Sequence, residues 1–428
     1  MYKIFYSMKV IKKLLVSTAV VLSTYCFSQM PHETFENIYK EIKKKNFFKA
    51  RDLFADNKRV LSVEYQYFTE AILDNAFNKP EKSNQKISQL EKSKTPLSDS
   101  LMLAIGRIRE DNCMKQHDYA GAKNALVAVL KQFSHLLTGD EIKDLKNNLR
   151  IWTALENEPQ QKLTLNGETR LKMEKDAAGL KNLKVRVGEE TMNFIFDTGA
   201  NISTVSASVA KRLGMKMIPA DIDVDAITGI SVKADLAVCK KIVLGNTVIE
   251  NAIFLVFADN ALSFPQINYQ INGILGFPVI AALKEMQLTQ DDFFIVPEKE
   301  TKIPALSNMA IDGLTPLIFV DGKHYKLDTG ADHTILYEPF YREYKEEIDN
   351  RYKATKIAMG GAGGKIEYDG FKINHTFHIL DQSISLKNIS VLKNKINKET
   401  VYGNIGQDVI RQFHKMTLNF DQMFIKFD

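Results

Sequence analysis

The chain has 428 residues, of which 45% are hydrophobic and 25% are charged. This length suits two or three domains, and the composition is that of an ordinary soluble globular protein. The formal net charge is +5, but the first 28 residues carry four lysines and no acidic residue, which leaves about +1 for the rest of the chain. The overall charge therefore gives no reason to expect binding to nucleic acid or to a membrane surface.

Residues 1–28 have the features of a secretory signal peptide. Lys12-Lys13 precede a short apolar stretch at residues 14–22, and Cys26-Phe27-Ser28 places small residues at the −3 and −1 positions of a cleavage site. An uncleaved membrane anchor is the alternative, but the apolar stretch is short against the roughly 20 residues that span a bilayer. The sequence predicts export to the periplasm or the cell exterior, with no stable membrane insertion after cleavage.

Residues 29–160 are expected to form an α-helical domain, because their apolar residues recur at intervals of three to four. Thr138-Gly139-Asp140-Glu141 has the pattern of a capping box, and Thr95-Pro96 has the pattern of a helix start with proline at the first position. The polar segment 156–161, which contains a proline, is expected to be the linker that ends this domain.

Two segments of the helical region, residues 46–50 and 118–122, carry an aromatic residue and an alanine at matching places, 72 residues apart. This spacing is about twice the tetratricopeptide period, so the region weakly resembles tetratricopeptide helical hairpins. Stacked hairpins present concave surfaces that bind protein partners, and a domain that only packs is the alternative.

The pattern changes to alternation after residue 161, which predicts β-rich lobes of barrel or sandwich type. Short helices are expected after Gly276, after Gly406 and over residues 338–348. The expected strands cover residues 163–165, 183–187, 243–247, 253–257, 293–296, 317–320, 371–373, 376–379 and 423–427.

The tetrapeptide Asp-Thr-Gly-Ala occurs twice in this β-rich half. The copies begin at Asp197 and Asp328, 131 residues apart, and each follows a strand-like run. Further matches occur between Gly273–Ile280 and Gly403–Ile410, at an offset of 130, and between Thr228-Gly229 and Gly360-Gly361. Matches in the same order at nearly constant offset indicate a duplicated lobe, with one copy at 161–300 and the other at 301–428.

The segment from Leu327 to Leu336 closely resembles the active-site segment of retroviral-type aspartic proteases, and Asp197–Asn201 resembles a second copy. Ile274-Leu275-Gly276 and Asn404-Ile405-Gly406 resemble the second structural signature of that family. Asn404 departs from the apolar residue expected there, which is expected to affect local packing more than catalysis. The resemblance implies a multidomain α plus all-β fold, in which an α-helical hairpin array precedes two homologous β-rich acid-protease lobes in a single chain, as in pepsin-like enzymes.

This resemblance also implies roles for the two repeated loops. Asp197 and Asp328 would face each other and share one proton, because two close carboxylates do not both ionise easily. Thr198 and Thr329 would form hydrogen bonds across the interface between the lobes.

The other loop residues are expected to support the carboxylates. Gly199 and Gly330 would allow a tight turn that presents N–H groups to the carboxylates. Ala200 and Ala331 lack the hydroxyl that pepsin-like enzymes usually carry there, which predicts activity at weakly acidic pH. The flap positions implied by the resemblance, expected to cover a bound peptide, are Thr228, Gly229, Gly360 and Gly361.

The sequence gives no indication of a cofactor or a metal. After removal of the signal, Cys113 and Cys239 have no metal-ligand spacing and fall in different predicted domains, and no His-Glu-x-x-His helix occurs. The predicted function is that of an exported aspartic endopeptidase, acting on peptide or protein substrates, with a protein partner for the helical domain. A catalytically silent peptide-binding protein that uses the same cleft is the alternative.

Overall fold

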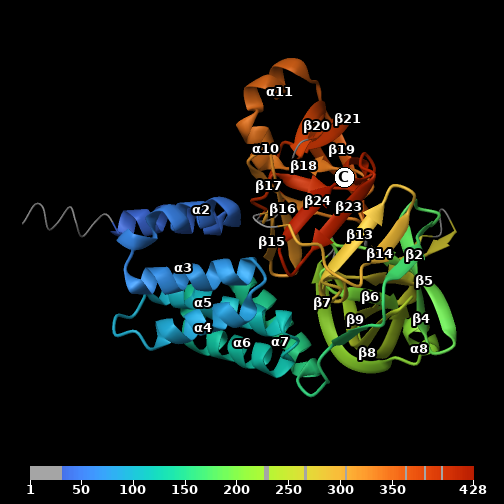
Figure 1. The fold of residues 1–428 in the computed structure, drawn as a ribbon, viewed down its shortest axis with the longest axis horizontal. Helices are drawn as coiled ribbons and strands as arrows, with labels where there is room; N and C mark the ends of the chain where they lie inside the picture. The colour runs from blue at the N-terminus through green and yellow to red at the C-terminus, as the bar shows by residue number, and fades with distance from the viewer. Residues whose placement is uncertain are drawn as a thin grey trace, which may run out of the picture.

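The computed structural model describes residues 31–225, 231–264, 268–303, 306–361, 364–379, 382–396 and 399–428. An N-terminal helical region is followed by β-rich domains (Figure 1). The predicted signal peptide lies outside the described residues. Among those described, no helix is long and apolar enough to cross a membrane.

Consecutive helices of the N-terminal region pack against each other in pairs, α3 on α4, α5 on α6 and α6 on α7. Residues 31–43 are also helical. The helices that follow are α2 (Phe47–Asn57), α3 (Val63–Ala76), α4 (Pro80–Glu91), α5 (Asp99–Lys115), α6 (Tyr119–Phe133) and α7 (Gly139–Leu155). The resemblance to tetratricopeptide hairpins stays a prediction.

The predicted helix starts had different outcomes. The capping box at Thr138 is present, with its hydroxyl accepting from the Glu141 backbone N–H and the Glu141 carboxylate accepting from the Thr138 backbone N–H. The start at Thr95-Pro96 was wrong, because α5 begins at Asp99. Extended backbone at Ser98, rather than at Thr95, leads into this helix.

The first β-rich domain is built on a sheet with the order β1-β9-β6-β12-β5-β4-β8-β7, and β8 also pairs with β9, which closes part of the sheet on itself. Its helices are α8 (Ala207–Arg212) and α9 (Phe277–Ala282). The strands on this path are β1 (Lys162–Leu165), β4 (Lys181–Val187), β5 (Glu190–Phe196), β6 (Ser203–Ser206), β7 (Lys216–Asp225), β8 (Ser231–Leu244), β9 (Thr247–Phe257) and β12 (Gly273–Leu275).

The expected strand at 243–247 was wrong as a single strand, because Val243 and Leu244 end β8, Thr247 begins β9, and residues 245–246 form the turn between them. Gly245 there has φ +58°, a left-handed conformation that interrupts a strand and favours glycine. The short strands β3 (Glu174–Lys175), β10 (Ser263–Phe264) and β11 (Tyr269–Gln270) lie beside the main path.

The second β-rich domain contains a sheet with the order β15-β16-β17-β22-β18-β21-β20-β19. The expected strands 371–373 and 376–379 are parts of one strand, β20, whose register shifts between Ile373 and His375. The elements are β15 (Met309–Asp312), β16 (Thr315–Val320), β17 (Lys323–Leu327), β18 (Ile335–Leu336), α10 (Glu338–Glu343), α11 (Lys345–Arg351), β19 (Ala354–Gly361), β20 (Gly364–Ile379), β21 (Gln382–Leu392), β22 (Gly403–Ile405) and α12 (Gln407–Ile410).

Strands from both β-rich domains join in a third sheet with the order β2-β14-β13-β23-β24. At its centre, Met286 of β13 lies opposite Leu418 of β23, and Leu288 lies opposite Met416. The main-chain pairing and these buried side chains fix the two domains to each other. The strands are β2 (Thr169–Lys172), β13 (Glu285–Thr289), β14 (Phe293–Val296), β23 (Lys415–Asn419) and β24 (Phe424–Phe427).

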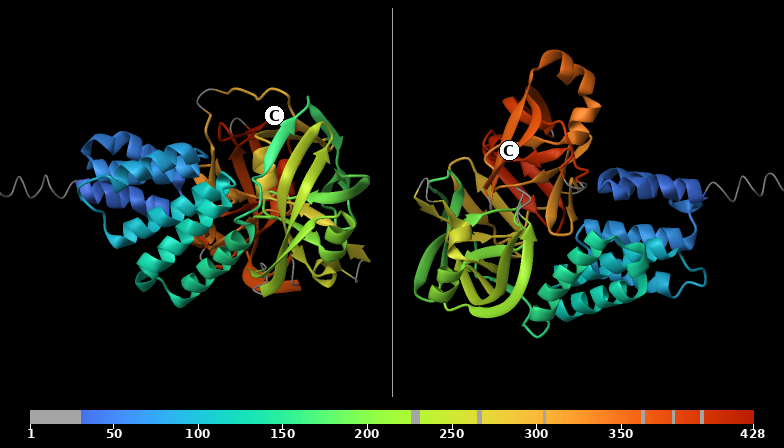
Figure 2. Two further views of the ribbon diagram at one scale, coloured as in Figure 1. Left: turned by 90° about the horizontal axis from the view of Figure 1, so that it is seen from below. Right: turned by 180° about the vertical axis from the view of Figure 1, so that it is seen from behind.

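The helical region contacts both β-rich domains (Figure 2). Helix α7 packs against β7, an edge strand of the first domain. Phe48 of α2 contacts Phe319 of β16, with 4.9 Å between the ring centroids. Just before α2, Lys45 Nζ lies 2.6 Å from a carboxylate oxygen of Asp312 in β15. The helical region therefore bridges the two domains.

Candidate active site

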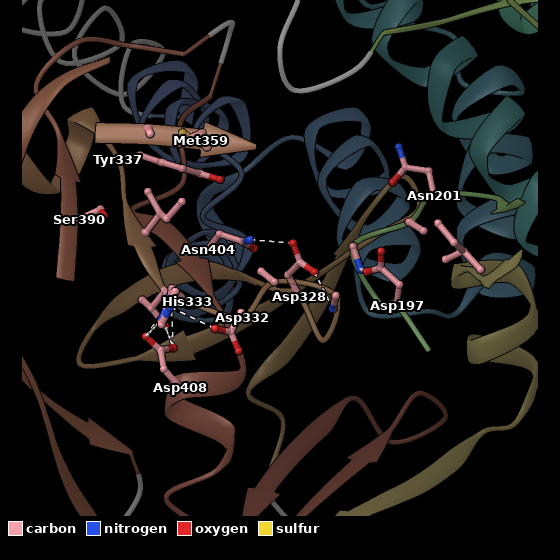
Figure 3. Close-up of a pocket in the computed structure, with 18 of the residues that line it drawn as sticks. Asp197, Asn201, Asp328, Asp332, His333, Tyr337, Met359, Ser390, Asn404 and Asp408 are labelled. Atoms are coloured by element: carbon pink, nitrogen blue, oxygen red, sulfur yellow. Dashed lines mark hydrogen bonds and ion pairs between the residues drawn. The ribbon is translucent and has the colours of Figure 1, made fainter. Parts of the chain in front are cut away.

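The two Asp-Thr-Gly-Ala loops begin where equivalent strands end. Asp197 follows β5 and Asp328 follows β17, and each strand runs parallel to a short strand, β12 or β22. The backbone N–H of Asp197 donates to Leu275 O at 3.2 Å, and that of Asp328 donates to Ile405 O at 3.0 Å. The same local pairing therefore positions both aspartates, whose side chains point toward each other (Figure 3).

Crossed hydrogen bonds lock the two loops together. The Thr198 hydroxyl donates to Leu327 O at 2.8 Å, and the Thr329 hydroxyl donates to Phe196 O at 3.0 Å. Each hydroxyl also accepts the backbone N–H of the opposite threonine, at 3.0 Å in both directions. Both threonines are buried, with exposed fractions of 0% and 1%. The contacts expected of Thr198 and Thr329 are thus present in the structure.

Glycine is needed after each threonine because the aspartate of the opposite loop lies too close to leave room for a side chain. The expected tight turn is present in both loops, where a backbone hydrogen bond from the alanine N–H to the aspartate C=O closes it. Neither glycine is among the described glycines with positive φ, so the backbone angles alone do not require glycine. A Cβ on Gly199 would lie 2.6 Å from Cγ of Asp328, and a Cβ on Gly330 would lie 2.4 Å from Cγ of Asp197. Each glycine leaves room for the carboxylate of the opposite domain.

Each glycine also donates a hydrogen bond to the carboxylate of its own loop. Gly199 N–H donates to Asp197 Oδ1 at 2.8 Å, and Gly330 N–H donates to Asp328 Oδ1 at 2.9 Å. This part of the expectation for the two glycines is present in the structure. The backbone donors are therefore matched in the two loops.

The environment of Asp197 favours its protonated form. Burial raises the pKa of Asp197 well above its ordinary value, and the adjacent Asp328 carboxylate raises that pKa further. Hydrogen bonds from the backbone N–H groups of Gly199 and Ala200 oppose this rise without cancelling it. Asp197 is therefore suited to hold a proton at a pH where an exposed carboxyl would have lost it.

The alanines of the loops act through their backbone. Ala200 O accepts from Phe277 N–H at 2.8 Å, and Ala331 O accepts from Gln407 N–H at 2.9 Å. These bonds hold each loop against the short helix that follows Gly276 or Gly406. A Cβ on Gly276 would lie 2.6 Å from the backbone carbon of Ile202, so this contact also needs glycine.

Sequence reasoning missed one side chain at the site, Asn404. Its Nδ2 donates to Asp328 Oδ2 at 2.7 Å, as Figure 3 shows. The expectation that this residue affects packing more than catalysis did not foresee that contact. The signal was present in the repeat, because the matching residue of the first lobe, Ile274, is apolar.

A cleft of about 890 Å³ contains both aspartates, a size typical of ligand sites. In the described part of the chain, no residue of the helical region lines it. The ionisable side chains on the side of the second domain are Asp332, His333, Tyr337, Lys372, Lys387 and Asp408. Apolar lining residues include Val224, Val232, Leu255, Phe257, Ile274 and Ile335.

Residues 183–279 match the aspartyl protease family. This segment includes Asp197 and the glycine element at 273–276. The chain contains an aspartyl protease-like region. No curated protein matches the chain.

Solved structures share limited similarity with this chain. Conglutin gamma, a basic 7S globulin from lupine seeds, is 10% identical, with a TM-score of 0.38, over 61% of this chain and 95% of that one. Basic 7S globulin from soybean is 11% identical, with a TM-score of 0.36, over 62% and 95%. A retropepsin-like aspartic protease from Rickettsia conorii is 17% identical, with a TM-score of 0.21, over 32% and 94%. These scores are too low to indicate a function.

The expected flap positions of the aspartyl protease-like region are described in part. Thr228 and Gly229 lie outside the described residues. The backbone of Gly360 pairs with that of Lys365, and the backbone of Gly361 pairs with that of Gly364, at the end of the β19–β20 hairpin. Met359, just before them, lines the cleft.

Proposed function

We propose that this protein is an exported aspartic endopeptidase, in which two homologous β-rich lobes, at 161–300 and 301–428, each supply one aspartate of a catalytic dyad. The crossed hydrogen bonds of Thr198 and Thr329 carry this proposal. They join the two loops so that Asp197 and Asp328 face each other in one cleft. An ordinary turn containing Asp-Thr-Gly needs no such bond to a second copy.

In this proposal the two carboxylates share one proton and activate a water molecule. The ionised carboxylate takes a proton from the water as its oxygen attacks the scissile carbonyl, and the protonated carboxyl donates to the carbonyl oxygen. Collapse of the resulting diol breaks the C–N bond and delivers a proton to the departing amine. The residues of the two loops suffice for this reaction.

The dyad should work at weakly acidic pH. Burial and Asp328 both raise the pKa of Asp197, so its proton is retained above the ordinary carboxyl range. An optimum well below about pH 3 would contradict the raised pKa.

An extended peptide would lie along the cleft beneath flaps near residues 228–229 and 360–361, held by backbone hydrogen bonds.

Export and the role of the helical region are further parts of the proposal. Residues 1–28 would direct export to the periplasm or the cell exterior and then be removed. Residues 29–160, a tetratricopeptide-like array, would bind a protein partner.

Peptide cleavage by the purified exported form tests the proposal. A mixed peptide library, read by mass spectrometry from about pH 3 to 8, gives both activity and specificity over the range of shared-proton titrations. We expect Asp197→Asn and Asp328→Asn each to lower the rate by at least about 100-fold. Asp56→Asn, a change at an exposed position of α2, is the matched control.

The outcome also separates the enzyme from the silent binding protein. Cleavage that persists in either aspartate variant would reject the dyad. A folded wild-type protein that binds library peptides but cleaves none at any pH would reject the enzyme and favour peptide binding.

A further inference from the structure

The two lobes differ at one position beside the aspartates. Ile274 lies opposite Ile195 in the parallel pair β12–β5, and Asn404 lies opposite Lys326 in the parallel pair β22–β17. Both therefore stand in register two residues before the aspartate of their own loop. The backbone frames are equivalent, so the side chains occupy equivalent places, and only Asn404 carries a hydrogen-bond donor.

The amide of Asn404 makes the surroundings of the two carboxylates unequal. Asp328 Oδ1 accepts from Gly330 N–H at 2.9 Å, as Asp197 Oδ1 accepts from Gly199 N–H at 2.8 Å. Asp328 Oδ2 accepts a further bond, from Asn404 Nδ2 at 2.7 Å. A donor aimed at a carboxylate oxygen stabilises the charged form of that carboxyl over the neutral one.

We propose that Asn404 is a positioning residue that keeps Asp328 as the ionised member of the pair and leaves the shared proton on Asp197. This inference rests on the proposed function, since it assigns the two roles within the same dyad. The apolar side chain of Ile274 gives Asp197 no such donor. The Asp197 carboxyl packs against Gly330 of the opposite loop, away from water, and this burial favours its neutral form.

Three other ionisable groups of the cleft, Asp332, His333 and Asp408, lie together to one side of Asp328 (Figure 3). The Asp332 carboxylate binds Arg411 and lies 3.0 Å from His333 Nε2. The Asp408 carboxylate accepts the Thr334 hydroxyl at 2.6 Å, and Lys372 Nζ donates to Ser390 at 2.8 Å. Lys387 also lines the cleft. The electric field of these charges acts on both carboxylates, whereas of the two aspartates only Asp328 accepts a hydrogen bond from Asn404.

Among the described residues, Tyr337 is a further titratable group whose pKa is affected by Asp328. Burial raises the pKa of Tyr337, and the charges of Glu399 and Asp328 raise it further, so its hydroxyl stays neutral. Asp197 is the ionisable group of the opposite loop, and the charge of Asp328 raises its pKa.

The assignment sets the direction of proton transfer. Asp328 takes a proton from the attacking water, while Asp197 gives its proton to the carbonyl oxygen, so that a neutral diol forms. When the C–N bond breaks, Asp328 passes its proton to the amine, and Asp197 recovers a proton from a diol hydroxyl. Every proton is accounted for and the starting state is restored.

Substitution of Asn404 by the residue of the other lobe tests the role. In Asn404→Ile, loss of the donor should move the acidic limb of the kcat/KM profile up by about one to two pH units. Below both midpoints, activity should fall by about 10- to 100-fold relative to wild type. Asn404→Ala is the second variant, in case Ile disturbs folding, and Asp56→Asn, at an exposed position of α2 outside the cleft, is the control.

A double variant that exchanges the residues at 274 and 404 tests which aspartate is ionised. Carbon-13 NMR of aspartate side chains, assigned with the two Asp→Asn variants, follows Asp197 and Asp328 separately in the full chain without substrate. We expect Asp328 to ionise first in wild type, and Asp197 to ionise first in Ile274→Asn/Asn404→Ile. An acidic limb that stays in place or moves down, or an unchanged order of ionisation, would overturn the proposal.

The NMR readout also keeps this inference separate from the proposed function. It needs no peptide cleavage, so it reports the effect of Asn404 even if the protein is not a peptidase. Absence of cleavage with Asp328 ionising first would reject the enzyme alone, whereas cleavage with Asp197 ionising first would reject the role of Asn404 alone.

Discussion

At the scale of single residues, Thr198 and Thr329 serve the fold as much as the site. Each hydroxyl is buried and satisfies one backbone C=O and one backbone N–H of the opposite loop. A buried polar group that loses its partner costs about 1–3 kcal/mol. These two side chains therefore tie the stability of the domain interface to the geometry of the aspartates.

We expect Thr198→Val to destabilise the protein by about 2–5 kcal/mol, because Val fills the space but leaves Leu327 O and Thr329 N–H unpaired. Thr198→Ser retains the hydroxyl and should cost much less. Thermal unfolding of the three proteins at one pH measures the difference. A larger loss of stability in Ser than in Val would show that the methyl group, and not the hydroxyl, matters.

The raised pKa of Asp197 predicts how stability depends on pH. The folded pKa lies above the ordinary aspartate value of about 3.9, so the protonated folded form is favoured below that value and its advantage is lost as pH rises through the folded pKa. We expect the thermal midpoint of wild type to fall relative to that of Asp197→Asn as pH rises from about 4. Parallel curves from pH 3 to 8 would contradict the shift.

At the scale of elements, one side chain of α7 forms hydrogen bonds with the backbone of β7 in the way that a paired strand would. Asn147 Nδ2 donates to Asp223 O at 2.7 Å, and Asn147 Oδ1 accepts from Asp223 N–H at 2.9 Å. Because β7 is an edge strand, its backbone groups would otherwise lack partners on this side. The same hairpin, β7–β8, leads to the predicted flap at Thr228-Gly229.

We expect Asn147→Ala to loosen this hairpin, since Asp223 loses both side-chain partners. Opening of β7 should become easier by about 1–2 kcal/mol, which raises amide hydrogen exchange there about 5- to 30-fold. Lys146→Ala, a change at the exposed neighbouring position of α7, is the control. Unchanged exchange in β7, measured by mass spectrometry, would show that packing alone fixes α7.

At the scale of the whole molecule, the helical region bridges the domains without entering the cleft. It contacts the first β-rich domain through α7 and the second through Phe48 of α2 and Lys45. The described cleft residues all belong to the β-rich half. The helical region therefore supports the two β-rich domains from outside the cleft, which we call its bracing role, whereas an inhibitory segment would occupy the cleft.

We therefore expect no gain of activity when the helical region is loosened. Phe48→Ala removes a buried ring that contacts Phe319 and should destabilise the protein by about 3–5 kcal/mol. Peptide cleavage, measured below the unfolding temperature, should stay equal to wild type or fall. Cleavage that rises several-fold would identify the helical region as inhibitory and reject the bracing role.

The sequence by itself determined the features that depend on local spacing: the change from helical to strand pattern, the capping box at Thr138, and the two loops that begin at Asp197 and Asp328. These follow from residues close together in the chain. Only the tertiary structure decided three other features. They are the contact of Asn404 with Asp328, the close approach of each carboxylate to the glycine of the opposite loop, and the hydrogen bonds between Asn147 and Asp223. Each joins residues distant in the chain, so no local pattern specifies it.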